Sequence, residues 1–95
     1  MQKILICDPD KLFRYNLGYV LESKGFVVQE ASRPSEAVKY VLKEEFGAVI
    51  FNMQLEDFNG VQIFSAIKAI DNKLPVIIVT DGDVTLSSVS SIIHE

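Results

Sequence analysis

Several acidic and polar side chains follow short apolar segments of this chain, at the points where those segments end. The residues at these points are Asp8, Pro9, Asp10, Asn52, Thr80, Asp81 and Asp83, and all of them except Pro9 have a polar side chain. Carboxylate and amide oxygens are the ligands that hard cations such as Mg²⁺ and Ca²⁺ prefer, and a carboxylate can also act as a nucleophile. Whether these residues act together depends on the elements that position them.

Four apolar runs alternate with four amphipathic segments along the 95 residues. The predicted strands are 4–7, 26–29, 48–51 and 75–79. The predicted helices run from the Asp10 cap to Gly25, from Ser32 and Pro34 to Gly47, from Gly60 to Ile70, and over roughly 84–93. This alternation predicts one α/β domain over 1–95, with a parallel sheet covered by helices on both faces. The functional crevice of such a sheet lies at the carboxyl ends of its strands. The chemistry-bearing residues are therefore expected to meet there.

The spacing of apolar residues also predicts which side chains are buried. The helix faces expected to be buried are Phe13, Leu17, Val20 and Leu21 in the first helix, Ala37, Val38, Val41 and Leu42 in the second, and Val61, Ile63, Ile67 and Ile70 in the third. Cys7 ends an apolar run and is expected to be a small buried hydrophobe. The half-polar second strand is expected at a sheet edge. We expect Tyr15, Tyr19 and Tyr40 to pack at the core boundary and not to form a binding platform.

Composition narrows the classes of function. The net charge of −4 and pI of about 4.9 argue against nucleic-acid binding, because most of this surface repels a phosphate backbone. A single cysteine excludes a disulfide within the chain and a thiolate metal cluster. The first apolar run, 4–7, is too short for a signal peptide or a membrane span. These features predict a cytoplasmic protein without membrane association.

Apolar runs and loop residues together resemble the receiver domain of two-component response regulators. The matching residues are Ile4 to Asp8, Gly25-Phe26, Glu36-Ala37, Val49 to Asn52, Asn59-Gly60 and Pro75 to Thr80. The resemblance implies a flavodoxin-like, doubly wound sheet with strand order 2-1-3-4. The family adds a fifth strand and a last helix, and we expect both to be missing because the sequence stops at Glu95.

The resemblance also implies a site. In the family, two acidic residues after the first strand hold Mg²⁺, an aspartate at the end of the third strand accepts the phosphoryl group, a threonine or serine ends the fourth, and a lysine ends the fifth. Here Asp8 matches the first acidic position, but Pro9 stands at the second and has no side-chain oxygen. Asn52 stands at the phosphoacceptor position, and a neutral carboxamide is a poor nucleophile. Thr80 matches the hydroxyl position, and Asp81 replaces the small residue that the family prefers.

These departures favour a degenerate pseudo-receiver, a non-catalytic signalling module that binds protein partners and has no cofactor. One alternative is a divergent phosphoacceptor that uses Asp8, Asp57 or Asp81. Asn52 as an engineered change and a weak Mg²⁺ or Ca²⁺ site at Asp8 with Asp81 are further alternatives. A flavodoxin-like nucleotide or flavin binder is disfavoured, because the first loop has no glycine. A homodimer is also expected, through the exposed edge of the fourth strand or through the first and last helices.

Overall fold

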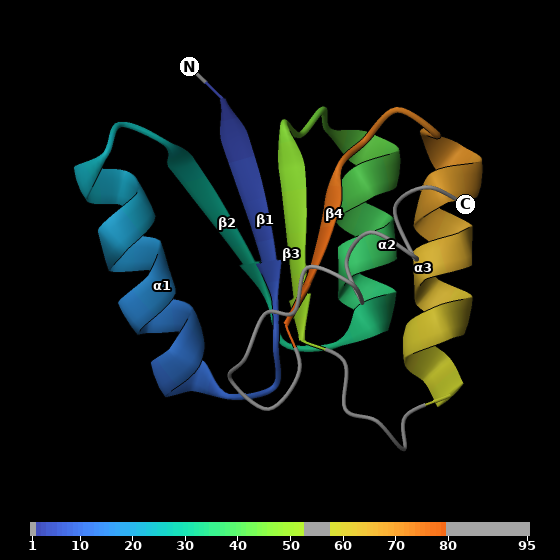
Figure 1. The fold of residues 1–95 in the computed structure, drawn as a ribbon, viewed down its shortest axis with the longest axis horizontal. Helices are drawn as coiled ribbons and strands as arrows, with labels where there is room; N and C mark the ends of the chain where they lie inside the picture. The colour runs from blue at the N-terminus through green and yellow to red at the C-terminus, as the bar shows by residue number, and fades with distance from the viewer. Residues whose placement is uncertain (1, 53–57, 80–95) are drawn as a thin grey trace.

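The computed structural model of the protein describes residues 2–52 and 58–79 (Figure 1). In chain order its elements are β1 (Lys3–Cys7), α1 (Lys11–Ser23), β2 (Val27–Ala31), α2 (Pro34–Lys43), β3 (Ala48–Asn52), α3 (Phe58–Ile70) and β4 (Val76–Val79). The four strands form one sheet in the order β2-β1-β3-β4, and every pairing is parallel. The predicted doubly wound sheet is confirmed, with β2 at an edge as expected. The predicted helix over 84–93 lies outside the described residues.

The helices divide between the two faces of the sheet. In Figure 1, α1 covers one face next to β2, whereas α2 and α3 lie side by side on the other. Successive side chains of a strand point to opposite faces. In β1, Leu5 and Cys7 therefore join the core under α2 and α3, whereas Ile4 and Ile6 join the core under α1.

Helix α1 begins and ends at residues that suit its termini. The Asp10 carboxylate accepts hydrogen bonds from the backbone N–H groups of Leu12 (2.9 Å) and Phe13 (3.4 Å), which confirms Asp10 as a capping residue. After Lys24, the chain reverses at Gly25, whose φ of 96° is a conformation that glycine adopts without strain.

The first turn of α2 is joined to the residue before its N-cap Arg33 by a side chain that reaches backward. The Glu36 carboxylate accepts hydrogen bonds from the Ser32 backbone N–H (2.8 Å) and hydroxyl (3.0 Å), and the bonds from Ser32 lower the pKa of Glu36. The helix ends at Lys43 and not at Gly47. Glu44 is already extended, and its carboxylate pairs with the ammonium group of Lys3.

Other boundaries differ by one or two residues, as is usual for sequence-based limits. β2 occupies Val27–Ala31 instead of 26–29, and α3 begins at Phe58, two residues before Gly60. β3 includes Asn52, and β4 begins at Val76.

Three residues expected in the core, Val20, Leu42 and Ile70, are exposed. Val20 is 47% exposed and Leu42 is 65% exposed. In α1, the buried Gly18 takes the central position against β2, which leaves Val20 on the flank of the helix. In α2, Tyr40 packs against the core instead of Leu42. Ile70 is also 38% exposed, whereas Ile67 is buried as predicted.

The expectation that Tyr15 and Tyr19 pack at the core boundary is wrong, because their side chains are 64% and 67% exposed, although Tyr40 does pack against the core.

Candidate functional site at the carboxyl ends of the strands

The sheet brings Asp8 and Asn52 to the same end of neighbouring strands. Cys7 pairs with Phe51 in the β1–β3 register, and Asp8 and Asn52 are the next residues along each strand. Parallel strands lie about 4.8 Å apart, so these two positions are adjacent, as predicted. Asn52 also pairs with Val79, the last residue of β4.

Other candidates from the sequence lie outside the described residues. They are Asp57, Thr80, Asp81 and Asp83. Asn52 is placed by its backbone alone, as the last residue of β3.

Asp8 is the buried polar side chain of this site, and it is 1% exposed. Its backbone N–H donates to the Ala31 carbonyl (3.0 Å), which extends the β1–β2 pairing by one step. Its Oδ1 accepts a hydrogen bond from the Asp10 backbone N–H (2.7 Å). Among the contacts of the described residues, its Oδ2 has no hydrogen-bond partner. A buried carboxylate oxygen without a partner is costly, so this oxygen is where a cation or a hydrogen-bond donor would bind most favourably.

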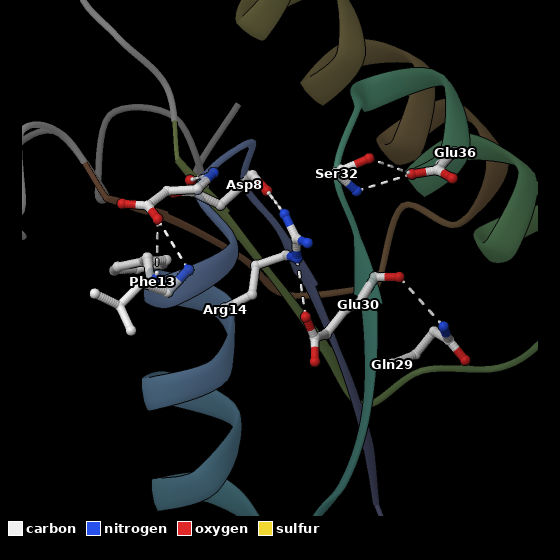
Figure 2. Close-up of polar contacts among 9 residues, drawn as sticks. Asp8, Phe13, Arg14, Gln29, Glu30, Ser32 and Glu36 are labelled. Atoms are coloured by element: carbon white, nitrogen blue, oxygen red, sulfur yellow. Dashed lines mark hydrogen bonds and ion pairs between the residues drawn. The ribbon is translucent and has the colours of Figure 1, made fainter.

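Arg14 holds the loop that carries Asp8. Its guanidinium donates to the Asp8 carbonyl oxygen (2.6 Å) and to Glu30 Oε1 (2.9 Å), as Figure 2 shows. The Arg14 side chain is only 13% exposed. It therefore joins the first turn of α1 to the end of β1 and to β2, and both contacts fix its orientation. Sequence reasoning missed Arg14, although it stands four residues after the capping Asp10, one helical turn along, and so above the same loop.

Cys7 lies directly before Asp8, and its thiol is unreactive. Burial, with smaller contributions from the nearby carboxylates of Asp8 and Glu36, raises the pKa of the Cys7 thiol to about 12. The thiol is therefore neutral at physiological pH and is a poor nucleophile and metal ligand. The prediction of a small buried hydrophobe is confirmed.

The described residues do not assemble a magnesium site. Pro9 offers no side-chain oxygen, and an Asp10 carboxylate oxygen is committed to the cap of α1. Over 2–52 and 58–79, no three His, Cys, Asp or Glu residues cluster with metal-binding geometry. Within residues 2–52 and 58–79, Asp8 alone supplies a buried carboxylate at this end, and one carboxylate falls short of the octahedral oxygen shell that Mg²⁺ needs.

Comparison with known proteins agrees with this fold. Residues 4–93 match the family model of the response regulator receiver domain. Sporulation initiation phosphotransferase F of Bacillus subtilis (strain 168) is 32% identical over 79 residues, which cover 83% of this chain and 64% of that protein. A receiver domain from Methanospirillum hungatei JF-1 superposes with a TM-score of 0.80 at 25% identity, over 97% of this chain and 72% of that one.

A third likeness is to a chain in a crystal structure of the histidine kinase ThkA in complex with the response regulator TrrA, a protein of Thermotoga maritima. Its TM-score is 0.81 at 22% identity, over 97% of this chain and 80% of that one, and it supports the fold alone.

The chain belongs to the response regulator receiver domain family of two-component signalling. It spans between 17% and 64% of the lengths of the curated relatives that it matches. No helix in the described part of the chain is both long and apolar enough to cross a membrane.

Proposed function

We propose that this receiver domain has lost phosphoryl transfer and works as a non-catalytic signalling module that binds a protein partner. The single observation that carries the proposal is Asn52 at the end of β3, beside Asp8, where the family has its phosphoacceptor aspartate. A carboxamide has no anionic oxygen to attack phosphorus, so the first step of the transfer lacks its nucleophile.

Two further features support this reading. Pro9 removes a metal ligand from the loop after β1, and the metal normally neutralises charge on the transferred phosphoryl group. Arg14 ties that loop to Glu30 through a side chain that is largely buried, so the loop is held in one position. A fixed loop suits a surface that is presented constantly.

A structure of a response regulator with the same fold indicates the kind of partner. TrrA is seen in complex with a histidine kinase, and a protein of that class is the partner we propose here, with the cytoplasm as the location. The acidic charge of −4 makes nucleic acid an unfavourable partner for this domain.

The second candidate is a divergent receiver that still accepts phosphate. The Oδ2 of Asp8, which has no hydrogen-bond partner among the described residues, favours it, because a buried carboxylate oxygen at the correct end of the sheet can act as a nucleophile or as a ligand for Mg²⁺.

Intact-mass spectrometry after incubation with acetyl phosphate and Mg²⁺ separates the two candidates. We expect no adduct of about +80 Da, the mass of one phosphoryl group. Asn52→Asp alone is expected to stay unmodified and to melt at a lower temperature, since it places a second carboxylate beside Asp8 without a metal to neutralise the pair. The variant with both Asn52→Asp and Pro9→Asp restores both missing carboxylates. It is the control that shows whether this fold can accept a phosphoryl group.

A stable adduct on the natural sequence contradicts the proposed function. Peptide mapping of that adduct would then identify the acceptor, because Asp8→Asn removes the adduct whether Asp8 is the nucleophile or a ligand for Mg²⁺. A single Asn52→Asp variant that is more stable and binds Mg²⁺ tightly would show that the remaining site is competent and that only the nucleophile had changed.

A further inference from the structure

The loop between β1 and α1 consists of Asp8, Pro9 and Asp10, and hydrogen bonds fix it at both ends. The Asp8 N–H donates to the Ala31 carbonyl of β2 (3.0 Å), and the Asp10 carbonyl accepts from the Arg14 N–H of α1 (3.1 Å). Only Pro9 stands between these two ends. The shape of the loop therefore depends on few backbone dihedral angles.

Pro9 restricts the backbone on both sides of it. Its ring fixes its own φ near about −65°, and it disfavours helical dihedral angles for the residue before it, so Asp8 stays extended. In that conformation the Asp8 N–H continues the pairing with β2. The Asp8 Oδ1 also accepts from the Asp10 N–H (2.7 Å), which closes a turn around the proline. Pro9 cannot bind a metal through its side chain, but it stiffens the turn that carries Asp8.

Arg14 fixes the same turn through its side chain. Its Nη1 donates to the Asp8 carbonyl oxygen (2.6 Å), and its Nε donates to Glu30 Oε1 (2.9 Å) (Figure 2). That carbonyl belongs to the planar peptide group that joins Asp8 to Pro9, so Arg14 orients the whole group. The two donors are separate nitrogens of one rigid guanidinium. A lysine has a single nitrogen and does not reproduce this geometry.

Glu30 orients the Arg14 side chain from the edge strand. It pairs with Ile6 in the β1–β2 register and so lies on the face of the sheet that α1 covers. The Arg14 side chain is 13% exposed, and a charge that is largely buried needs a partner. The Glu30 side chain, which is 45% exposed, is that partner. An exposed residue of β2 is thereby connected to the buried Asp8.

We propose that Arg14 is a positioning residue for the Asp8 carboxylate, that Pro9 and Glu30 assist it, and that the loop keeps its shape without a divalent cation. Where the family has two carboxylates that hold Mg²⁺, this loop has one carboxylate, a proline and an arginine contact to the backbone. Hydrogen bonds within the chain thus order the loop. The inference goes beyond the proposed function, and its test measures loop order and not phosphorylation, so either can fail without the other.

Amide hydrogen exchange, followed by NMR on the ¹⁵N-labelled natural chain, is the direct test. The Asp10 N–H reports the turn, because it donates to Asp8 Oδ1. The Val49 N–H reports unfolding of the core, because it donates to the Pro75 carbonyl (2.9 Å) and Val49 is fully buried. Added Mg²⁺ is expected to leave the protection factor of the Asp10 N–H unchanged.

Variants of the three assisting contacts should open the turn without opening the core. Arg14→Lys is expected to lower the Asp10 protection factor roughly tenfold or more, because it removes charge-assisted hydrogen bonds. Glu30→Gln and Pro9→Ala should each lower it by a smaller factor, since the Arg14 side chain remains. In each case the fall at Asp10 should exceed the fall at Val49. If Arg14→Lys does not fold, the other two variants still decide the question.

The ion pair between Lys3 and Glu44 provides a matched control, because it lies at the opposite end of β1. Glu44→Gln removes the partner of a lysine as Glu30→Gln removes the partner of an arginine, and the two glutamate side chains are 32% and 45% exposed. Glu44→Gln is expected to leave the Asp10 protection factor unchanged relative to that of Val49.

Any of three results overturns the proposal. A rise in Asp10 protection when Mg²⁺ is added to the natural chain would mean that a cation orders the loop. Unchanged Asp10 protection in both Arg14→Lys and Glu30→Gln would mean that the turn around Pro9 forms without them. An equal fall in Glu44→Gln and Glu30→Gln would mean that the effect is not local to this loop.

Discussion

The two faces of the sheet are built differently. Under α2 and α3 the strands contribute Leu5, Cys7, Val49, Phe51, Val76 and Ile78, all at most 2% exposed. Under α1 the buried cluster is Ile4, Ile6, Ile50 and Val79, and most of the apolar residues packed against it are only partly buried. In the described chain, one face is sealed by two helices and the other is covered by one.

The two faces of the sheet therefore differ in how much they contribute to stability. Burial of apolar surface is the main stabilising term, so most of the folding free energy lies on the sealed face. Helix α1 is held partly by polar contacts at its first turn, the Asp10 cap and the Arg14 hydrogen bonds. It can therefore keep exposed apolar side chains without losing its place on the sheet. Among the described residues, the face under α2 and α3 is therefore the more stabilising one, whereas α1 leaves several large apolar side chains exposed.

The largest expected effect comes from a matched pair in β4. Ile78 is 2% exposed under α2 and α3, whereas its neighbour Ile77 is partly exposed on the α1 face. Ile78→Ala is expected to lower the free energy of unfolding by about 2–5 kcal/mol, the range for a large-to-small change in a sealed core. Ile77→Ala should cost about half as much, because less surface is buried and the site is less enclosed. Urea unfolding of both variants measures the ratio.

Equal losses for the two isoleucines would contradict the distinction between the faces. A larger loss for Ile77→Ala would reverse it. The slope of the urea transition should match among the three proteins, since a changed slope would signal an altered denatured state.

A second prediction concerns alkaline pH and the Cys7 thiol on the sealed face. Its pKa rises from the ordinary value of 9.0 to about 12 in the folded chain, chiefly because it is buried. Below pH 9 both states hold the proton. Between pH 9 and about 12 the unfolded chain releases it and the folded chain retains it, so stability falls as the pH rises. One such proton corresponds to a loss of about 1.4 kcal/mol per pH unit.

Cys7→Ala provides the reference for this titration, because tyrosines and lysines also ionise in the same range. The Ala variant is less stable at pH 7 owing to the lost side chain, but its stability should decline less steeply above pH 9. Parallel declines for the two proteins in urea titrations at several pH values would mean that the folded Cys7 ionises nearly as readily as the unfolded one.

The sheet could be predicted from the sequence because each strand and each crossover helix follows from a local pattern of apolar residues, and that pattern repeats along the chain. Runs such as 48–51 are apolar at every position, which suits a strand that is covered on both faces, and the amphipathic segments between them favour crossover helices. The placement of Asp8 and Asn52 at one end then follows from parallel pairing alone. The helix ends and the exposed residues could not be predicted from these patterns alone, because they depend on contacts between segments distant in the chain.

Three residues show where sequence reasoning stops. Arg14 meets Glu30 across 16 residues, and nothing in the spacing of the sequence pairs them. Val20 was assigned to the core from helical periodicity, although the close approach of α1 to β2 at Gly18 leaves it on the flank. The Asp8 side chain was predicted at the site, but only the packed structure shows that one of its oxygens is buried without a partner among the described contacts.

The smallest expected effect tests how tightly α1 lies on its face of the sheet. Gly18 is buried in the middle of α1, and a Cβ added there would lie 3.5 Å from Val28 Cγ1 and 4.0 Å from Ile6 Cδ1, which is ordinary contact. Glycine in a helix interior is about 1 kcal/mol less favourable than alanine. Gly18→Ala should therefore raise the free energy of unfolding by up to about 1 kcal/mol, since neither neighbour has to move.

The equivalent position on the sealed face behaves in the opposite way. Ala37 of α2 is fully buried, and Ala37→Gly should lose both the helix preference and a buried methyl group, a cost of about 1–2 kcal/mol. Thermal unfolding of the two variants at one pH provides the comparison. If Gly18→Ala is destabilising instead, then α1 lies against β2 as closely as α2 lies against its own face. The open character of this side would then be confined to the exposed side chains of Leu12, Tyr15 and Tyr19.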